Sequence, residues 1–558
     1  WATLFFTNDR GFRRIGFVLR HTSIQFVLPV AILETLIRFS DHVTDRTAAP
    51  WGYLIFHSNM AGVFFPQDKP YADFVSKFWD HAPVEFEGQA YVGLAAIAGL
   101  LAIIGIQLYR LARGRFKLIF SLTDHKVLNI FFWTSILLLF ISFGEPFVDG
   151  HENWLFHIGP LRQFRAIGRF NWVFFYVVNV IVVYRLFKVS QRNKFVLAAT
   201  LFLIPAILLF DMYYNIKGKQ DNLNNRIAEL SDVQNQIPED RWLQNFNPAS
   251  YQAILPLPFF QSGSENIARL SADQEIVKQS YIVSLKTGLP VFGGVSARAS
   301  LSQTAKSISL VLNPTSPAAV LNDIHDQRPF LVLVREGTLD ENEERILHLS
   351  KPLANSVNYK LYSISPSTLK NIPEQRYESI RTQFDTLKKY PIGPFFSADS
   401  EAAVIYNSFD DLNGKPYLGK ASLAWKLTDL CEMFNSIVNV PGNYNCSFWM
   451  NHVNEDLYPR LTIEAFSEDE TGKVKPYYLL TDALKQIKAF DGNWGLVEFP
   501  LDVPAAGMRV HVRVWNKDMP KGTQFEFDEF VLRPQQTTIY RSFGDTIQMN
   551  NCFYHSWK

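Results

Sequence analysis

The stretch QAYVGLAAIAGLLAIIGIQLY, residues 89–109, contains 21 residues and no charged side chain. As an α-helix it is long enough to cross about 30 Å of hydrocarbon. Three shorter uncharged stretches follow it before residue 215, and a weaker stretch that includes charged residues precedes it. We therefore expect a polytopic helical membrane module over residues 1–213, with five spans at 15–37, 89–109, 127–146, 170–187 and 195–213.

Basic residues are distributed unequally between the segments that connect these spans. Clusters of Arg and Lys lie at residues 10–20, 110–126 and 185–194, whereas residues 38–88 and 144–169 show no basic excess. Because basic segments remain on the cytoplasmic side, this alternation predicts that 38–88, 144–169 and everything after 214 lie outside. The expected location is a bacterial inner (cytoplasmic) membrane with an extracytoplasmic, periplasmic C-terminal region.

The residues after the last apolar stretch have the composition of globular domains. Residues 214–245 are polar and predict a helical stalk. Residues 246–395 alternate strand and helix signals, which favours an α/β domain with a parallel sheet. Residues 396–558 contain short alternating segments between turn residues, which favours an all-β sandwich or jelly roll. The predicted fold is therefore multi-domain.

Composition excludes several classes of protein. A net charge of +1 over 558 residues argues against a strongly basic nucleic-acid binder, and 15% aromatic residues argue against a disordered chain. Neither a P-loop nor a GxGxxG or CxxC motif is present, so no nucleotide or redox cofactor is indicated. The cofactor is otherwise unknown, and a divalent metal stays open. The first residue is Trp1, from which we expect a fragment or a processed form.

Three cysteines, Cys431, Cys446 and Cys552, all lie in the last predicted domain. An oxidising compartment permits one disulfide and one remaining thiol, and spacing does not choose the pair. Three buried free thiols are the alternative.

The arginines Arg162, Arg165 and Arg169 lie on the predicted outer side, directly before the fourth span. Their i, i+3, i+7 spacing would place them on one helical face. Since guanidinium groups match phosphate oxygens, they are candidates for binding a lipid-linked phosphate. Contacts with anionic lipid, or ion pairs with the acidic residues of 145–152, explain them equally.

Three carboxylates are weak candidates for catalysis. Asp41 and Asp45 lie in an outer segment that also contains many aromatic residues, and Glu87 lies at the start of the second span. A carboxylate at the edge of a span is a candidate base or metal ligand, although a solvated loop charge is the ordinary explanation.

Aromatic residues are frequent in the last domain. Trp449, Trp494 and Trp515 are candidates for stacking on a carbohydrate, and packing in the core is the alternative. In residues 525–530, FEFDEF, phenylalanines alternate with acidic residues, which predicts a strand with a solvated acidic face.

Several of these segments resemble a known superfamily. FRAIGRFNW at 164–172, EGQAYVG at 87–93 and RTAAPWGYLIFHSNMAGVFFP at 46–66 look like bacterial membrane glycosyltransferases of the GT-C type. The resemblance covers roughly residues 1–215. It implies a polyprenyl-phosphate-linked sugar donor, and a catalytic acidic residue in an outer loop early in the chain, before the first residue of this sequence.

Two functions follow as expectations. The first is a membrane glycosyltransferase that transfers sugar from a polyprenyl-phosphate-linked donor to a cell-envelope acceptor, a glycan or a protein. The second is a non-catalytic, membrane-anchored subunit of an envelope secretion, motility or surface-polysaccharide machine, with a docking ectodomain. Both imply a membrane lipid or lipid-linked sugar as partner, and an envelope protein complex stays open.

Overall fold

The computed structural model divides into two compact units, with the boundary between residues 232 and 233. It describes residues 12–557 with gaps at 44–51, 54, 68–70, 79–83, 117–119, 156, 159–163, 192–193, 232–241, 243–245, 263–267, 270–273, 296–299, 313, 336, 338, 357–358, 427–429, 452–460, 470, 481–485 and 516–523. We describe each unit by itself.

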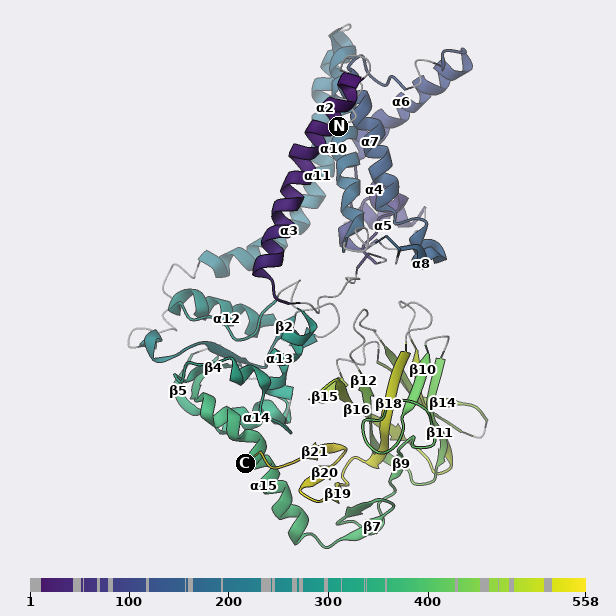
Figure 1. The fold of residues 1–558 in the computed structure, drawn as a ribbon. Helices are drawn as coiled ribbons and strands as arrows, with labels where there is room; N and C mark the ends of the chain where they lie inside the picture. The colour runs from purple at the N-terminus through teal and green to yellow at the C-terminus, as the bar shows by residue number, and fades with distance from the viewer. Residues whose placement is uncertain are drawn as a thin grey trace. The chain divides into compact units, whose positions relative to one another are not determined.

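The first unit is helical (Figure 1). Three of its helical segments are long and apolar enough to cross a membrane, namely Ile15–Ser40, Leu94–Ala112 and Ile167–Ser190, and two shorter apolar helices lie at Lys126–Ser142 and Thr200–Tyr213. These five correspond in sequence to the five expected spans. The helices of the unit are α2 (Phe12–Thr22), η1 (Ser23–Val27), α3 (Leu28–Ser40), α4 (Met60–Phe64), α5 (Tyr71–Ser76), η2 (Phe86–Gly88), α6 (Leu94–Ala112), α7 (Lys126–Ser142), η4 (Phe147–His151), α8 (Glu152–Leu155), η5 (Ile167–Phe170), α10 (Asn171–Ser190) and α11 (Lys194–Ser231).

Helix α10 packs against α6, α7 and α11. Its buried residues Phe174, Val178 and Val182 form a core with apolar residues of α6 and α7. The absence of a side chain at Gly99 lets α6 approach Val182 closely, because a Cβ there would overlap the valine. The expected stalk is a continuation of α11, which extends as one helix to Ser231.

Contacts at the helix ends show that α6, α7, α10 and α11 alternate in direction. At one end, the Leu94 backbone N–H donates to Asp211 Oδ2 at 2.8 Å, so the start of α6 meets α11. At the opposite end, Tyr184 of α10 donates to Asp124 Oδ1, directly before α7, at 2.6 Å. This is the arrangement that successive membrane spans require.

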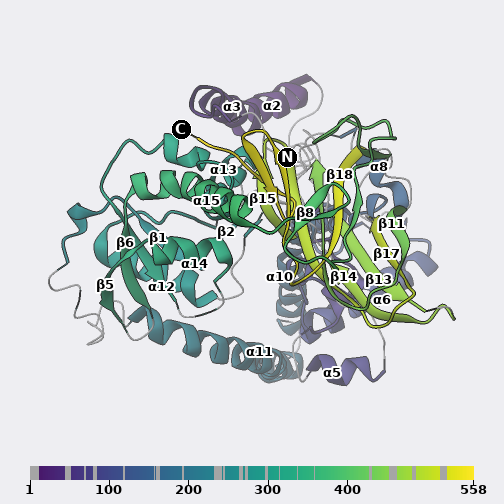
Figure 2. The same cartoon turned by 90° about the horizontal axis from the view of Figure 1, so that it is seen from below.

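The second unit begins with a four-stranded sheet in the order β1-β4-β6-β5, with helices on both faces (Figure 2). Helix α12 covers one face, and α13, α14 and α15 cover the other. The expected parallel sheet is wrong in part: β1 and β4 are parallel, whereas β6 pairs antiparallel with both β4 and β5. The elements are η7 (Pro248–Ser250), β1 (Ile254–Leu257), β2 (Gln261–Ser262), β3 (Ala268–Arg269), α12 (Gln274–Thr287), α13 (Leu301–Leu312), η8 (Ala319–Asn322), β4 (Phe330–Val334), α14 (Glu341–His348), β5 (Lys351–Asn355), β6 (Lys360–Ile364) and α15 (Pro366–Thr386).

The remainder of the second unit is formed by antiparallel sheets, as expected from the change in sequence pattern. One sheet has the order β10-β18-β12-β16-β15, with β9 also paired to β18, and a second has the order β11-β17-β13-β14. A third sheet, β21-β20-β19-β8-β7, contacts α15. The strands are β7 (Tyr390–Ile392), β8 (Phe395–Ser397), β9 (Ile405–Asn407), β10 (Leu423–Lys426), β11 (Leu430–Val438), β12 (Gly442–Asn451), β13 (Thr462–Glu468), β14 (Val474–Leu480), β15 (Ile487–Asp491), β16 (Trp494–Val503), β17 (Met508–Trp515), β18 (Gln524–Pro534), β19 (Ile539–Phe543), β20 (Thr546–Met549) and β21 (Cys552–Tyr554).

The first two of these sheets share one apolar core. Phe434 of β11 stacks on Phe530 of β18 with ring centroids 4.8 Å apart, which joins the two layers. Cys431, Cys446 and Cys552 are all free thiols, and the first two are buried. Burial raises the pKa of the Cys431 thiol to about 12, so this thiol remains protonated and unreactive.

Candidate functional site

Three segments that the sequence singled out meet at one end of the helical unit. They contain Phe56–Ser58, Gly88 and Gly168. The Gly168 backbone N–H donates to the Phe56 carbonyl oxygen at 2.8 Å. A Cβ at Gly168 would lie 2.8 Å from the Gly88 Cα, so only glycine permits this approach.

A buried polar contact fixes the three segments together. Asn171, the first residue of α10, donates through Nδ2 to the Ser58 hydroxyl at 3.0 Å and to the Gly88 carbonyl oxygen at 2.6 Å. Ser58 also donates to the Gly88 carbonyl oxygen, at 2.7 Å. Both side chains are buried, and Asn171 Oδ1 has no hydrogen-bond partner among the residues that the structure describes. Because a buried amide oxygen seldom lacks a hydrogen-bond donor, the unsatisfied Oδ1 indicates that Asn171 has a role beyond packing.

An ion pair lies on this scaffold. Glu87 directly precedes Gly88, and Arg169 directly follows Gly168. The Nε and Nη2 atoms of Arg169 donate to the two carboxylate oxygens of Glu87, a bidentate arrangement. The Arg169 side chain is 59% exposed, whereas that of Glu87 is 14% exposed. We call Ser58, Glu87, Gly88, Arg169 and Asn171 the Glu87–Arg169 cluster.

The geometry of the pair determines what it can bind. A guanidinium group has five N–H donors, and Glu87 uses those on one edge. Since Arg169 is mostly exposed, its other edge can donate to a second group with two oxygens, such as a phosphate. Glu87 thus holds the planar group in a fixed orientation and reduces the entropy lost on binding.

The structure does not place in this cluster the other two arginines that the sequence analysis predicted to bind phosphate. Arg165 lies in a bend outside any helix, and η5 begins only at Ile167. The predicted single helical face is therefore wrong for Arg165 and Arg169, because the backbone of Gly168 bonds to Phe56 instead. Arg162 lies outside the described residues. The acidic partner of Arg169 is Glu87, which the sequence analysis had named as a candidate for catalysis and not as a partner of the arginines.

The two acidic candidates of the first outer segment are not part of the cluster described above. Asp41 follows the end of α3, and its Oδ1 accepts from the Val43 backbone N–H at 3.1 Å, which is a local turn contact. Asp45 lies outside the described residues. No group of three or more His, Cys, Asp or Glu side chains that could hold a metal occurs among the residues that the structure describes.

The three tryptophans do not form one stacking surface. Trp449 of β12 is buried, stacks on Tyr417 at 4.1 Å and donates through Nε1 to the Asn551 carbonyl oxygen. Trp494 begins β16 in the same sheet, whereas Trp515 ends β17 in the other sheet. Trp449 is a core residue because Ala489, Leu496 and Tyr417 pack around it, whereas the other two tryptophans are partly accessible.

Sequence reasoning missed that the three carboxylates of β18, Glu526, Asp528 and Glu529, are all buried. All three were expected on a solvated face of the strand. The register between β12 and β18 shifts here, and Glu529 has a φ of 51°, so the regular alternation of faces is broken. Burial raises the pKa of Asp528 to about 6 and that of Glu529 to about 7. No residue pattern in the sequence signals this bulge.

Comparison with known proteins identifies little. Residues 3–212 match the family model DUF6311, described only as a domain of unknown function. No curated protein matches. Among solved structures, the VP2 subviral particle of infectious bursal disease virus matches at 6% identity and a TM-score of 0.17, covering 24% of this chain and 33% of that chain. This chain thus spans about a third of the capsid protein's length.

Two carbohydrate-binding domains also match. The CBM22-1 xylan-binding domain of Paenibacillus barcinonensis Xyn10C gives 13% identity and a TM-score of 0.16 over 26% of this chain and 88% of that chain. TmCBM61, solved with beta-1,4-galactotriose, gives 14% identity and a TM-score of 0.15 over 26% and 97%. TM-scores this low support no conclusion about fold or function.

Proposed function

We propose that this chain is part of a GT-C-type membrane glycosyltransferase, and that the Glu87–Arg169 cluster binds the phosphate of a polyprenyl-phosphate-linked sugar donor. The observation that carries the proposal is the mostly exposed side chain of Arg169, whose guanidinium group Glu87 orients at the end of a group of apolar helices. A lipid-linked phosphate arrives at the membrane surface with its chain in the hydrocarbon, so it needs a cation at such a helix end.

The roles within the cluster follow from the contacts. Arg169 would bind the phosphate oxygens and stabilise the charge that develops as the sugar leaves. Glu87 is engaged with Arg169 and is a positioning residue. Asn171 and Ser58 hold the Gly88 carbonyl group and thereby the backbone next to Glu87. The carboxylate that deprotonates the acceptor hydroxyl is not assigned to a residue of this chain.

In this proposal the helical unit lies in a bacterial inner membrane, and the second unit, whose antiparallel sheets form a sandwich or jelly roll, lies in the periplasm. The basic clusters at 10–20, 110–126 and 185–194 support this orientation. The second unit would then present the acceptor, a glycan or a protein of the envelope.

The test is binding of undecaprenyl phosphate to the full chain in lipid nanodiscs. Loss of one charge-assisted contact costs about 1.5–3 kcal/mol, so Arg169→Ala should weaken binding about 10- to 150-fold. Arg169→Lys should restore it only in part, because the ammonium group lacks the planar fork. Arg113→Ala is the matched control: Arg113 is an exposed arginine at the other end of α6 and should leave binding unchanged. Wild-type affinity in Arg169→Ala would contradict the proposal.

A non-catalytic envelope subunit is the second candidate, and one observation favours it. The helical segment Ile15–Ser40 is long and apolar enough to cross a membrane, and none of it is buried against the rest of the described chain. Such a helix can pack against a helix of another protein in the membrane. If Arg169→Ala lowers the melting temperature but leaves undecaprenyl phosphate binding unchanged, the subunit is the better account.

A further inference from the structure

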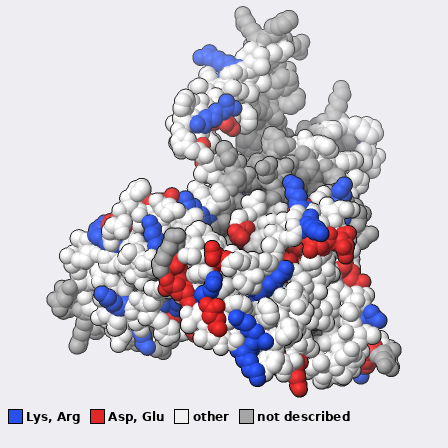
Figure 3. Space-filling view, turned by 60° about the horizontal axis from the view of Figure 1, so that its bottom comes forward, with Lys and Arg blue, Asp and Glu red and all other residues white. Residues whose placement is uncertain are grey.

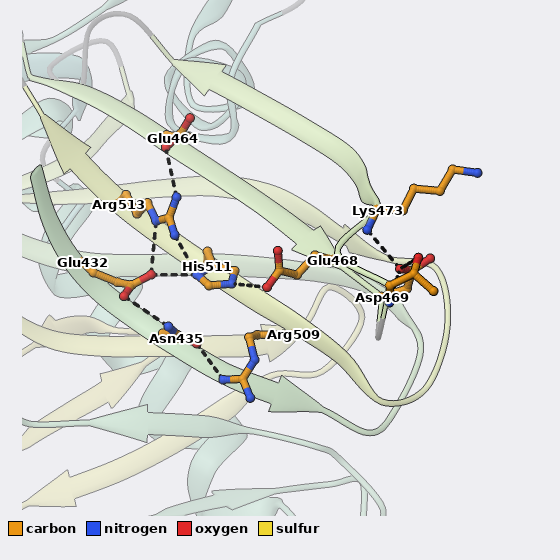
Figure 4. A network of polar contacts seen from close by, with 10 residues as sticks. Glu432, Asn435, Glu464, Glu468, Asp469, Lys473, Arg509, His511 and Arg513 are labelled. Atoms are coloured by element: carbon orange, nitrogen blue, oxygen red, sulfur yellow. Dashed lines mark hydrogen bonds and ion pairs between the residues drawn. The ribbon is translucent and has the colours of Figure 1, made fainter.

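The outer face of the sheet β11-β17-β13-β14 carries a connected network of charged side chains (Figure 4). In β17 the apolar residues at even positions point into the core, so Arg509, His511, Arg513 and Trp515 lie on the opposite face. Because β17 lies between β11 and β13, this row of side chains runs along a middle strand of the sheet and has a neighbouring strand on each side. Figure 4 shows His511 and Arg513 directed toward carboxylates of the two neighbouring strands, and Arg509 directed toward Asn435 of β11.

His511 occupies the centre of the network. Its Nδ1 lies 2.7 Å from Glu432 Oε1 of β11, and its Nε2 lies 3.0 Å from Glu468 Oε1 of β13. Arg513 donates through Nε to the same Glu432 oxygen at 3.1 Å. The imidazole ring also stacks on Phe466, with centroids 4.7 Å apart and planes 17° apart. These contacts leave His511 almost buried and hold the planar groups in fixed orientations.

The network is close to neutral in charge. Two arginines, Arg509 and Arg513, stand beside three carboxylates, Glu432, Glu464 and Glu468, so neither sign is in large excess. In the view of Figure 3, acidic patches lie directly beside basic patches, and neither sign covers the visible face. A balanced face attracts neither a polyanion nor a polycation, because long-range steering requires an excess of one sign.

The same face also offers free polar atoms and apolar surface. Glu468 uses one carboxylate oxygen for His511, and Arg509 uses Nη1 for Asn435, so each keeps further acceptor or donor atoms. Ile437, paired with Arg509, and Leu479, paired with Glu464, are exposed beside them. Donors, acceptors and apolar groups thus alternate at the spacing of neighbouring strands, about 5 Å.

From this arrangement we propose that the outer face of the β11-β17-β13-β14 sheet binds a neutral oligosaccharide. Adjacent sugar hydroxyls both donate and accept, so they match a carboxylate beside a guanidinium. The CH faces of a pyranose ring match Trp515 and the exposed aliphatic groups. Fixed side chains lose little entropy on binding such a flexible ligand. This inference is independent of the proposed donor site, and it holds equally for a non-catalytic subunit.

The experiment is calorimetric titration of the full chain in nanodiscs with cellohexaose, maltohexaose and chitohexaose, and with hexagalacturonic acid as the charged counterpart. At least one neutral hexasaccharide should bind, and hexagalacturonic acid should bind more weakly. Trp515→Ala and Arg509→Ala should each reduce the affinity about tenfold or more. Trp494→Ala, on the other sheet, is the matched control and should not change it.

Several results would overturn the inference. The first is that no neutral hexasaccharide binds at millimolar concentration. The second is that hexagalacturonic acid binds more tightly than the neutral hexasaccharides. The third is that Trp494→Ala and Trp515→Ala lose the same amount of affinity for the sugar. Arg509 is exposed, so Arg509→Ala is expected to fold even if Trp515→Ala does not. Undecaprenyl phosphate binding, measured on the same Arg509→Ala preparation, should stay at the wild-type value, which separates this site from the Glu87–Arg169 cluster.

Discussion

The two units place their side chains in opposite ways. In the helical unit large apolar residues face outward, as with Phe202 at 80% exposure, while Ser58 and Asn171 are buried. In the second unit the phenylalanines of β18 are buried, and the outer face of the neighbouring sheet carries the charged network around His511. The first arrangement suits a hydrocarbon environment and the second suits water. The contrast concerns the residues that face outward, because both units have an apolar core, and the helical unit has the buried polar contact of Ser58 and Asn171 in addition.

The largest difference should appear on truncating one phenylalanine in each unit. Phe527→Ala removes a fully buried ring from the core of the second unit and should cost about 3–5 kcal/mol of unfolding free energy. Phe202→Ala removes a ring that faces outward and should change stability by about 0.5 kcal/mol or less. Denaturant unfolding in detergent checks both. Equal losses of unfolding free energy in the two variants would mean that the face of α11 that carries Phe202 packs against protein.

The second unit should also respond to pH, through its buried carboxylates. Folding raises the pKa of Asp528 to about 6 and of Glu529 to about 7, chiefly by burial. The folded state therefore binds these protons more tightly than the unfolded state, and stability is greatest at low pH. The unfolding free energy should fall by up to about 1.4 kcal/mol per pH unit and group, from about pH 4 to 6 for Asp528 and from about pH 4.5 to 7 for Glu529.

Melting curves of the wild type, Asp528→Asn and Glu529→Gln across this range test the point. Each variant should show a smaller pH dependence than the wild type, because one of the two titrating groups is gone. If the melting temperature depends on pH in both variants as it does in the wild type, groups other than Asp528 and Glu529 control the pH dependence.

In the helical unit a buried polar contact should matter more than a neighbouring half-buried one. Asn171→Ala removes the donor to Ser58 and Gly88 and should cost about 1–3 kcal/mol. Asn179→Ala, in the same helix, removes a partly buried contact to the Val92 carbonyl oxygen and should cost less. Thermal unfolding in detergent compares the two. A larger loss for Asn179→Ala would contradict the central role of Asn171.

The sequence predicts the two halves of the chain well, because each depends on local pattern. Uncharged stretches anticipate α6 and α10, and alternating residues anticipate the strands after residue 396. Pairing across the chain was not predictable. Glu87 and Arg169 lie 82 positions apart, and no local sequence pattern predicts that Arg169 pairs with Glu87 and not with an acidic residue nearer in the sequence. The bulge that buries Glu529 likewise depends on the register with β12, which is a tertiary property.

The mistaken expectations have related causes. Helical spacing placed Arg165 and Arg169 on one face, but the helix begins only at Ile167, where Gly168 lies against Gly88, so Arg165 lies outside it. A βαβ-like order of elements suggested a parallel sheet, but β5 and β6 form an antiparallel pair with a short connection. In each case a contact with a distant segment outweighed the local signal.

The central claim is that the Glu87–Arg169 cluster binds a lipid-linked phosphate and is not only a structural ion pair. Exchange of the two residues in the double variant Glu87→Arg/Arg169→Glu tests it most directly, because the pair is kept while the exposed guanidinium is moved. The account predicts that each single variant melts at lower temperature, that the exchanged pair recovers much of this loss, and that undecaprenyl phosphate binding stays about 10- to 150-fold weaker than in the wild type. Wild-type phosphate affinity in the exchanged protein would contradict the claim.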